Sequence, residues 1–242
     1  MEVAVLGLGE AGGRIAADLA AAGCTVRGWD PARTSSAASD VDAVREADVV
    51  LSLNAATAAL AVARGVAGAL RADAVYADLN TAAPALKREL ARAVPVAFAD
   101  VALVGVVPST GLRTATLASG SGAERFAQLF RPVGMPVDVV GAEPGDAAGL
   151  KLLRSVFMKG IAASAIESLE AAEAAGVADY VRADIASVLG EPLLERLLTG
   201  SRLHAARRAE EMHAAAEHVR DLGVPPRIAT AAAAWLEQLR NS

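Results

Sequence analysis

Short apolar runs alternate with longer segments of helical periodicity through the first part of the chain. The first run, residues 2–6, is rich in β-branched side chains and is followed by glycines, after which Ile15, Leu19 and Ala22 share one helical face. Further runs typical of strands cover residues 25–29, 48–53, 74–78 and 94–98. These runs are apolar on both faces, as the strands of a parallel sheet covered by helices must be. The pattern predicts an α/β fold with a Rossmann-type, doubly wound parallel sheet, which residues 114–119 and 137–140 would extend.

The pattern changes at Pro144, where the strand-like runs stop. A helix with this proline in its first turn can run to about Ala175, because Gly176 then ends it. Shorter helical segments follow at residues 178–189, 192–198, 201–222 and 226–239. We therefore predict two domains, a sheet domain over residues 1–143 and a smaller all-α domain over residues 144–242.

Composition and charge narrow the classes of partner. Hydrophobic residues make up 54% of the chain but aromatic residues only 3%, so the core must be built from Ala, Val and Leu, which suits helices packed on a sheet. The net charge of -5 offers no general attraction to phosphate backbones or anionic lipids, and we expect neither nucleic-acid nor membrane partners. No apolar run is long enough to span a bilayer without a charged residue. A single cysteine, Cys24, fits the reducing cytoplasm, which is the location we predict.

A glycine-rich motif joins the first predicted strand to the first predicted helix. It reads Gly7-Leu8-Gly9-Glu10-Ala11-Gly12. In a G-x-G-x-x-G element at this place, the first glycine permits a tight turn, the second lets the backbone approach a pyrophosphate, and the third lets the helix pack against the strand. The N–H groups of the helix N-terminus then point at the anion. These six residues are the predicted dinucleotide-binding loop; the alternative is a glycine turn without a ligand.

The choice of coenzyme depends on the end of the second predicted strand. Asp30 lies 18 residues after Gly12, the place of the acidic residue that binds the adenosine ribose in this type of site. Its carboxylate would repel a 2′-phosphate, so the sequence favours NAD over NADP. Arg33, Thr34 and Ser35 follow closely and offer the alternative of binding the 2′-phosphate of NADP. A simple turn at Asp30 is the remaining interpretation.

Two further pairs of residues follow strands of the predicted sheet. Leu53 and Asn54 come after the third strand, and Asn80 and Thr81 come after the fourth. In open α/β sheets a ligand lies across the carboxyl ends of the strands, so both pairs are predicted to line the dinucleotide site. Either pair can also cap a helix, and the two roles are compatible.

The order of further motifs supports a family resemblance. After the glycine loop come Asp78-Leu79-Asn80-Thr81-Ala82-Ala83-Pro84, then Asp100-Val101-Ala102-Leu103-Val104-Gly105-Val106, and then Lys151 with Ala147 and Ser155 four residues to either side. With this order the chain resembles the β-hydroxyacid dehydrogenases related to 6-phosphogluconate dehydrogenase. The resemblance implies a nicotinamide-dependent oxidoreductase with a Rossmann domain, in which residues 100–106 form the substrate loop and Lys151 is the catalytic residue.

The resemblance also implies substrate contacts, and here the sequence departs from the family pattern. Val104 stands where the family has a serine, Val106 replaces a glycine, and Ser155 replaces an asparagine. Because the loop lacks polar donors, a typical hydroxycarboxylate fits it poorly. The helical half, with residues 152–157 after the lysine and residues 204–212, is more similar to a poorly characterised branch of the family. The predicted substrate residues are Val104, Gly105, Ser155 and His204.

The expected chemistry centres on Lys151. Reduction of a carbonyl needs a hydride from the cofactor and a proton for the developing alkoxide, so an acid must lie within hydrogen-bond reach of that oxygen. With Lys151 in this role, we predict hydride transfer between NAD(P)(H) and a small hydroxy or carbonyl substrate. One alternative is an imine reductase, against which the lysine argues because those enzymes usually carry an acidic or phenolic side chain there. The other alternative is a non-catalytic dinucleotide-binding protein.

Three histidines fall on the helix predicted over residues 201–222. His204 and His218 share a face of that helix but are about 21 Å apart, too far to bind one metal ion, and no metal site is predicted elsewhere. A solvated or dimer-facing helix is the simpler interpretation. In the alternative, His204 or Arg207 reaches a substrate across a domain or subunit boundary. Helical domains of this kind often bury faces by self-association, so we expect a homodimer.

Overall fold

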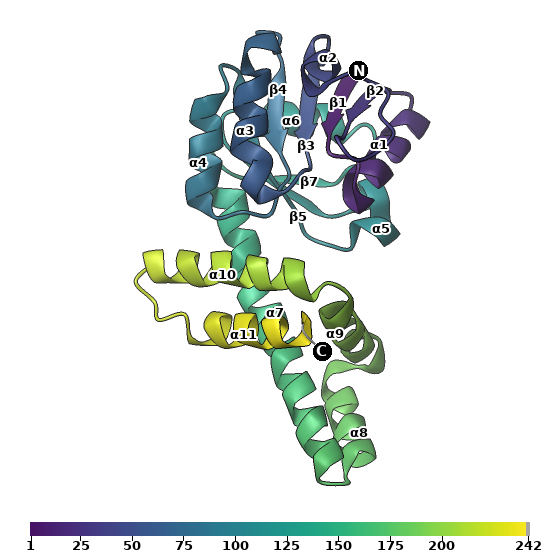
Figure 1. Ribbon diagram of the computed structural model, residues 1–242, viewed down its shortest axis with the longest axis vertical. Coiled ribbons are helices and arrows are strands. Elements are labelled where there is room, and N and C mark those ends of the chain that lie inside the picture. The colour runs from purple at the N-terminus through teal and green to yellow at the C-terminus, as the bar shows by residue number, and fades with distance from the viewer. Residues whose placement is uncertain (241–242) are drawn as a thin grey trace. The chain divides into compact units, whose positions relative to one another are not determined.

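The chain forms two units, Met1–Lys151 and Leu152–Ser242, and the computed structural model describes residues 1–240 (Figure 1). The first unit contains one sheet with the strand order β2-β1-β3-β4-β5-β6-β7. The strands are β1 (Glu2–Leu6), β2 (Thr25–Trp29), β3 (Val49–Ser52), β4 (Val75–Asp78), β5 (Ala97–Leu103), β6 (Thr116–Ser119) and β7 (Val137–Gly141). Neighbouring strands pair in parallel except β5 and β6, which are antiparallel. The predicted Rossmann-like α/β fold is confirmed, with one antiparallel pair that the sequence pattern did not indicate.

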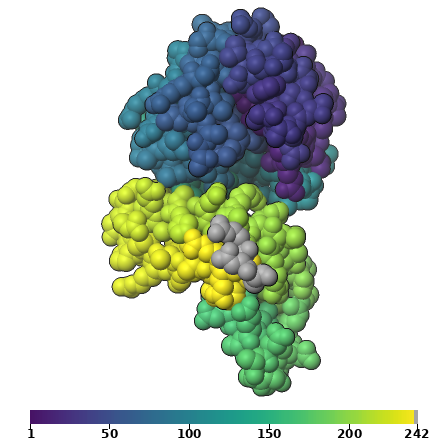
Figure 2. All heavy atoms as spheres, viewed as in Figure 1, coloured from purple at the N-terminus to yellow at the C-terminus, as the bar shows by residue number. Residues whose placement is uncertain are grey.

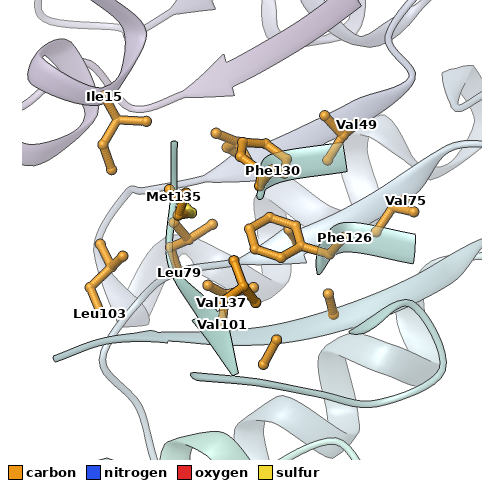
Figure 3. Packing of buried hydrophobic residues seen from close by; sticks show 14 of the residues in the cluster. Ile15, Val49, Val75, Leu79, Val101, Leu103, Phe126, Phe130, Met135 and Val137 are labelled. Atoms are coloured by element: carbon orange, nitrogen blue, oxygen red, sulfur yellow. The ribbon is translucent and has the colours of Figure 1, made fainter. Parts of the chain in front are cut away.

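Helices cover both faces of this sheet. They are α1 (Glu10–Ala21), α2 (Asp40–Val44), α3 (Ala56–Val66), η1 (Ala67–Ala69), α4 (Pro84–Ala93), α5 (Val107–Thr110), η2 (Gly111–Arg113) and α6 (Ala123–Phe130). On one face, Ile15 of α1 and Phe126 of α6 belong to one buried cluster with strand residues such as Val49 (Figure 3). On the other face, α2, α3 and α4 bury strand residues such as Tyr76 and Phe98. Burial of both faces explains why the strands are continuous apolar runs.

Strand β5 is longer and begins later than the strand predicted at residues 94–98. It runs from Ala97 to Leu103, so residues 100–103 of the predicted substrate loop belong to a strand, and the prediction of a loop was wrong there. Asp100 interrupts the apolar pattern, yet its side chain is completely buried and forms an ion pair with Lys87. The charge of Asp100 therefore concealed the strand in the sequence.

The second unit is helical, as predicted. It contains the greater part of α7 (Asp146–Ala174), which begins in the first unit, and then α8 (Ala178–Leu189), α9 (Glu191–Leu203), α10 (Ala205–Asp221) and α11 (Arg227–Arg240). Helices α10 and α11 lie side by side and bury Met212 and Leu236 with Leu152 of α7 (Figure 1). Because α7 begins at Asp146, Pro144 precedes the helix instead of lying in its first turn. None of the helices within residues 1–240 is long and apolar enough to cross a membrane.

The helix predicted over residues 201–222 is wrong at its N-terminal end. Helix α9 extends to Leu203 and α10 begins at Ala205, so His204 occupies the junction between them. The backbone of His204 has φ −124° and ψ 28°, which is not helical, and its carbonyl accepts a hydrogen bond from Arg208 N–H. His204 and His218 therefore do not share a helix. No glycine or proline lies between residues 201 and 207, so the periodicity gave no sign of the break.

Candidate functional site

The glycine loop, residues 7–12, packs against the end of β3. Gly7 has a φ of +105°, and a Cβ at this residue would lie 2.3 Å from the carbonyl oxygen of Leu53. A Cβ on Gly12 would lie 1.9 Å from the carbonyl oxygen of Gly7, so α1 can approach β1 this closely only with glycine there. A Cβ on Gly9 would have no neighbouring atom within 4 Å among the described residues. The backbone at Gly9 is thus open at the N-terminus of α1, as close approach of a pyrophosphate requires.

The Asp30 carboxylate links the end of β2 to the glycine loop. One of its oxygens accepts a hydrogen bond from Leu8 N (2.8 Å), and the other accepts one from Ala32 N (2.9 Å). Because an ionised carboxylate can accept about four hydrogen bonds, Asp30 can still accept from a ribose hydroxyl. Arg33 is exposed, whereas the Ser35 hydroxyl is bonded to the backbone of Asp30. Of the two side chains, Arg33 is the better placed to meet a 2′-phosphate.

Polar side chains gather where β3 and β4 end. Asn80 Nδ2 donates to Asp78 Oδ1 at 2.5 Å. The same nitrogen lies 3.2 Å from both Ser52 Oγ and Asn54 Oδ1, and Asn54 Nδ2 donates to Ser52 Oγ at 3.1 Å. Asn80 Oδ1 is buried and has no hydrogen-bond partner within residues 1–240. Buried polar atoms are rarely left without a partner, so this oxygen is an acceptor that a ligand can satisfy.

The Lys151 side chain reaches the same edge of the sheet from α7. Its Nζ donates a hydrogen bond to Thr81 Oγ1 at 2.7 Å. The N-cap of α4 is Ala83, so the Thr81 hydroxyl does not cap that helix. Lys151, Thr81 and Asn80 line one small hollow. The structure therefore brings the predicted catalytic lysine and the predicted cofactor residues Asn80 and Thr81 together within the first unit.

A second lysine of the first unit, Lys87 on α4, was missed by the sequence analysis. It is 1% exposed, and its Nζ lies 2.6 Å from Asp78 Oδ2 and 3.1 Å from Asp100 Oδ1. Burial acts to lower the pKa of Lys87, but the carboxylates of Asp100 and Asp78 outweigh this effect and raise that pKa above its usual value. Among the 23 basic residues of the chain, lysine occurs at three positions, Lys87, Lys151 and Lys159. The small number of lysines in the sequence is the signal that could have identified Lys87 as a residue with a specific role.

The predicted substrate residues Val104 and Gly105 follow the end of β5. Val104 is half-buried and Gly105 is exposed. They are not among the residues that line the hollow at Lys151, where β5 contributes Val101 and Ala102 instead. The end of β5 and the two residues after it therefore bring no polar side chain to the hollow at Lys151.

Ser155, also predicted to contact substrate, is buried within the second unit beside an ion pair. Its hydroxyl donates to Glu211 and accepts from Lys159 Nζ at 3.2 Å. Lys159 Nζ also donates to Glu211 Oε1 at 2.9 Å. Burial lowers the pKa of Lys159, and the carboxylate of Glu211 offsets this only in part. The Ser155 hydroxyl is thus engaged by two charged neighbours.

Within residues 1–240 no group of three His, Cys, Asp or Glu side chains is arranged to hold a metal ion.

Known proteins are similar to this chain in sequence and in fold. Residues 2–141 match the family described as the NAD binding domain of 6-phosphogluconate dehydrogenase, and residues 172–239 match a domain of unknown function, DUF1932. A conserved protein of unknown function, described as structurally similar to 3-hydroxyacid dehydrogenases, is 28% identical with a TM-score of 0.78, over 100% of this chain and 97% of that chain. A 3-hydroxyisobutyrate dehydrogenase of Mycobacterium tuberculosis, solved with L-serine, is 20% identical with a TM-score of 0.81, over 99% and 94% of the two chains. An imine reductase of Myxococcus stipitatus, solved with NAD+, is 20% identical with a TM-score of 0.68, over 99% and 93%.

These similarities support different levels of inference. At 20% identity, the dehydrogenase and the imine reductase show that the fold is shared. The family match covers more than half of the chain and includes the glycine loop, Asp30, and Asn80 with Thr81. The family resemblance predicted from the motifs is therefore confirmed. The chain belongs to the family of nicotinamide-dependent oxidoreductases that share the NAD-binding domain of 6-phosphogluconate dehydrogenase.

Proposed function

We propose that the protein transfers a hydride between a nicotinamide dinucleotide and a small hydroxy or carbonyl substrate, with Lys151 as general acid and base. The observation that carries this proposal is the Lys151–Thr81 hydrogen bond, which holds an ammonium group at the carboxyl edge of the dinucleotide-binding sheet. A bound nicotinamide supplies or accepts the hydride. In reduction, Lys151 gives a proton to the developing alkoxide oxygen; in oxidation, its neutral form removes the hydroxyl proton. An ammonium has three N–H groups, so Lys151 can bind Thr81 and a substrate oxygen together.

A coenzyme titration followed by a substrate screen tests this function. Purified protein is titrated with NADH and NADPH, and small hydroxy acids, aldehydes, ketones and cyclic imines are then screened at saturating coenzyme by its change in absorbance. We expect turnover of a hydroxy or carbonyl compound. Turnover of cyclic imines alone would instead indicate an imine reductase. Dinucleotide binding without turnover would indicate a non-catalytic binding protein, and either result contradicts the proposal.

We further propose that NAD is the preferred coenzyme, because the Asp30 carboxylate lies where a 2′-phosphate would be repelled. Replacing Asp30 with serine is expected to shift the preference toward NADPH, with the exposed Arg33 nearby to bind the phosphate. We expect the ratio of the Kd for NADPH to that for NADH to fall at least about tenfold, or about 1.4 kcal/mol, in fluorescence titrations. Asp73→Ser, which changes an aspartate that is 74% exposed, is the matched control and should leave the ratio unchanged. An unchanged ratio in a folded Asp30→Ser variant would contradict the preference for NAD.

We also propose that the second unit mediates a homodimer. Helix α8 contains no buried residue, and Val188 on this helix is 78% exposed. An apolar groove of about 650 Å³ lies beside it, lined from α7 by residues such as Phe157 and Ile161. Figure 2 shows that the tip of this unit, where α7 turns into α8, projects beyond the yellow helix α11. Each copy of the chain carries both the groove and exposed apolar side chains of α8, such as Val188, so a two-fold arrangement can cover both at once.

Sedimentation equilibrium checks the dimer. We expect the wild-type protein to sediment as a dimer at micromolar concentration. Val188→Glu should shift it toward monomer, because the dimer would have to bury an unpaired carboxylate. Leu222→Glu, which changes another exposed apolar residue of the second unit outside the groove, should remain dimeric. A monomeric wild-type protein would contradict this proposal.

A further inference from the structure

The start of α7 is fixed by a buried carboxylate of the sheet. Asp100 Oδ2 accepts hydrogen bonds from Gly145 N (3.1 Å) and Ala148 N (2.9 Å). Backbone N–H groups at a helix N-terminus have no partner within the helix, so a side chain that accepts from them anchors the whole first turn. Lys151 lies on the next turn of α7. The position of its backbone therefore depends on Asp100.

Ser119 of β6 strengthens this anchor. Its hydroxyl accepts from Ala147 N at 3.0 Å and donates to Asp100 Oδ2 at 3.3 Å. Ser119 and Asp100 are both completely buried and are register partners in the antiparallel pair β5–β6. Two side chains of the sheet thus bind three backbone N–H groups at the start of α7.

The side chain of Lys151 is held through a second chain of contacts, which begins at Asp78. Asp78 Oδ1 accepts a hydrogen bond from Asn80 Nδ2 at 2.5 Å. The next residue, Thr81, supplies the hydroxyl oxygen that accepts from Lys151 Nζ at 2.7 Å. Asp100 therefore holds the backbone that carries Lys151, and Asp78 holds the segment that carries its hydrogen-bond acceptor.

Lys87 binds both of these carboxylates. Its Nζ lies 2.6 Å from Asp78 Oδ2, 3.0 Å from the Asp78 carbonyl oxygen and 3.1 Å from Asp100 Oδ1. Asp78 and Asp100 are register partners on adjacent strands, so Lys87 places one ammonium between two neighbouring buried carboxylates. An apolar side chain would fill the same space without the cost of desolvating a charge, so packing alone does not explain a lysine at this position.

We propose that Lys87 is a positioning residue for Lys151. Its ammonium pairs with Asp78 and Asp100 and holds their side chains directed at Asn80 and at the start of α7, and so sets where Lys151 Nζ lies. The inference rests on the proposed role of Lys151 in the reaction. It adds the requirement that Lys87 acts through the Asp78 and Asp100 carboxylates and not through contact with substrate.

A spectroscopic test separates positioning from stability and does not depend on turnover. The chain has three lysines, so reductive methylation with ¹³C-formaldehyde, which labels lysines and the N-terminal amine, gives a simple NMR spectrum, in which the Lys151 signal is identified by its loss in Lys151→Met. Lys87→Met is compared with Leu90→Ala, a matched control that removes a buried apolar side chain from the same helix. We expect both variants to unfold at lower temperature than wild type, but the Lys151 signal to shift only in Lys87→Met. An unshifted signal in folded Lys87→Met, or equal shifts in the two variants, would overturn the inference.

Kinetics provide the second measurement. With a substrate from the screen, Lys87→Met should lower kcat by up to about 100-fold, the size of effect that a small misplacement of a reacting group causes. The Kd for NADH should change far less than kcat in Lys87→Met, because the glycine loop and Asp30 are not bonded to Lys87, and Leu90→Ala should keep the wild-type kcat well below its unfolding temperature. If the wild-type protein turns nothing over, the proposed function fails, whereas the NMR comparison still decides the inference.

A double variant keeps the test usable if Lys87→Met does not fold. Lys87→Met with Asp100→Asn removes a buried positive charge together with a buried negative one, so we expect it to fold. The double variant should show a displaced Lys151 signal and a reduced kcat. Its kcat should not fall below that of Asp100→Asn alone, because Lys87 and Asp100 act as one unit. A wild-type signal with a wild-type kcat, or fully additive losses, would contradict the proposed positioning role.

Discussion

Replacing Lys151 with methionine is expected to lower kcat by about 10²- to 10⁴-fold, the range typical for the loss of a general acid or base. Methionine has an unbranched chain but no ammonium, so it cannot donate to Thr81 Oγ1 or give a proton to a substrate oxygen. The affinity for NADH should stay close to that of the wild type, because the glycine loop and Asp30 lie on other elements of the sheet domain. Steady-state kinetics at saturating NADH, combined with an NADH titration, measure both quantities.

Arg88→Met is the matched control for this substitution. Arg88 is exposed on α4 in the same unit, so the control also removes one positive charge but leaves the hollow at Lys151 intact. We expect its kcat to equal that of the wild type. A Lys151→Met variant with wild-type kcat would show that another group supplies the proton. Equal losses in both variants would show that net charge, and not Lys151, determines the rate.

Gly9→Ala is expected to weaken NADH binding at least about tenfold, or about 1.4 kcal/mol, without loss of stability. A Cβ on Gly9 has no neighbour within 4 Å among residues 1–240, so the protein without ligand tolerates it. The added methyl group would, however, occupy space that the fingerprint leaves for a pyrophosphate. Isothermal titration with NADH and thermal unfolding of the free protein measure the two effects separately.

Gly12→Ala should affect both quantities. Its Cβ would lie 1.9 Å from the carbonyl oxygen of Gly7, and since this contact is with backbone, a change of rotamer cannot relieve it. We expect a loss of about 1–3 kcal/mol in the free energy of unfolding, which lowers Tm by about 2–4 °C per kcal/mol, together with weaker NADH binding. Gly68→Ala is the control for both variants, because Gly68 lies in η1 and its Cβ would have no neighbour within 4 Å in the described part of the chain. NADH binding by Gly9→Ala as tight as in the wild type would mean that the pyrophosphate does not approach this loop.

Most of the sheet was predictable because strands buried on both faces have to be continuous apolar runs. Strands β1 and β2 begin and end at the predicted residues. The antiparallel direction of β6 was not predictable, because it depends on the path of the connection and not on the side-chain pattern. Strand β5 was misplaced because Asp100 has a polar side chain whose charge is compensated by Lys87 from another element. A sequence pattern cannot reveal such a distant partner.

In the site, too, features set by the local sequence were predictable, and features that depend on partners from distant elements were not. The glycine loop and Asp30 were predictable because their roles follow from chain geometry at the ends of β1 and β2. The anchor of α7 was not, because Asp100 reaches the backbone at Gly145 and Ala148 from a different strand. Ser155 also illustrates the limit: its place in the motif suggested a substrate contact, but its hydroxyl is bonded to charged groups of the second unit.

The most direct test of the central claim is to follow the hydride itself. The protein is incubated with the carbonyl compounds of the screen and with NADH that carries deuterium at one or the other of its two transferable positions, and the products are analysed by mass spectrometry. We predict that one of the two labelled forms delivers a single deuterium to the carbon of a product alcohol with the wild-type protein, and that the Lys151→Met variant binds NADH but forms little labelled product. NADH binding without deuterium in any alcohol, or transfer at the wild-type rate by Lys151→Met, would contradict the account.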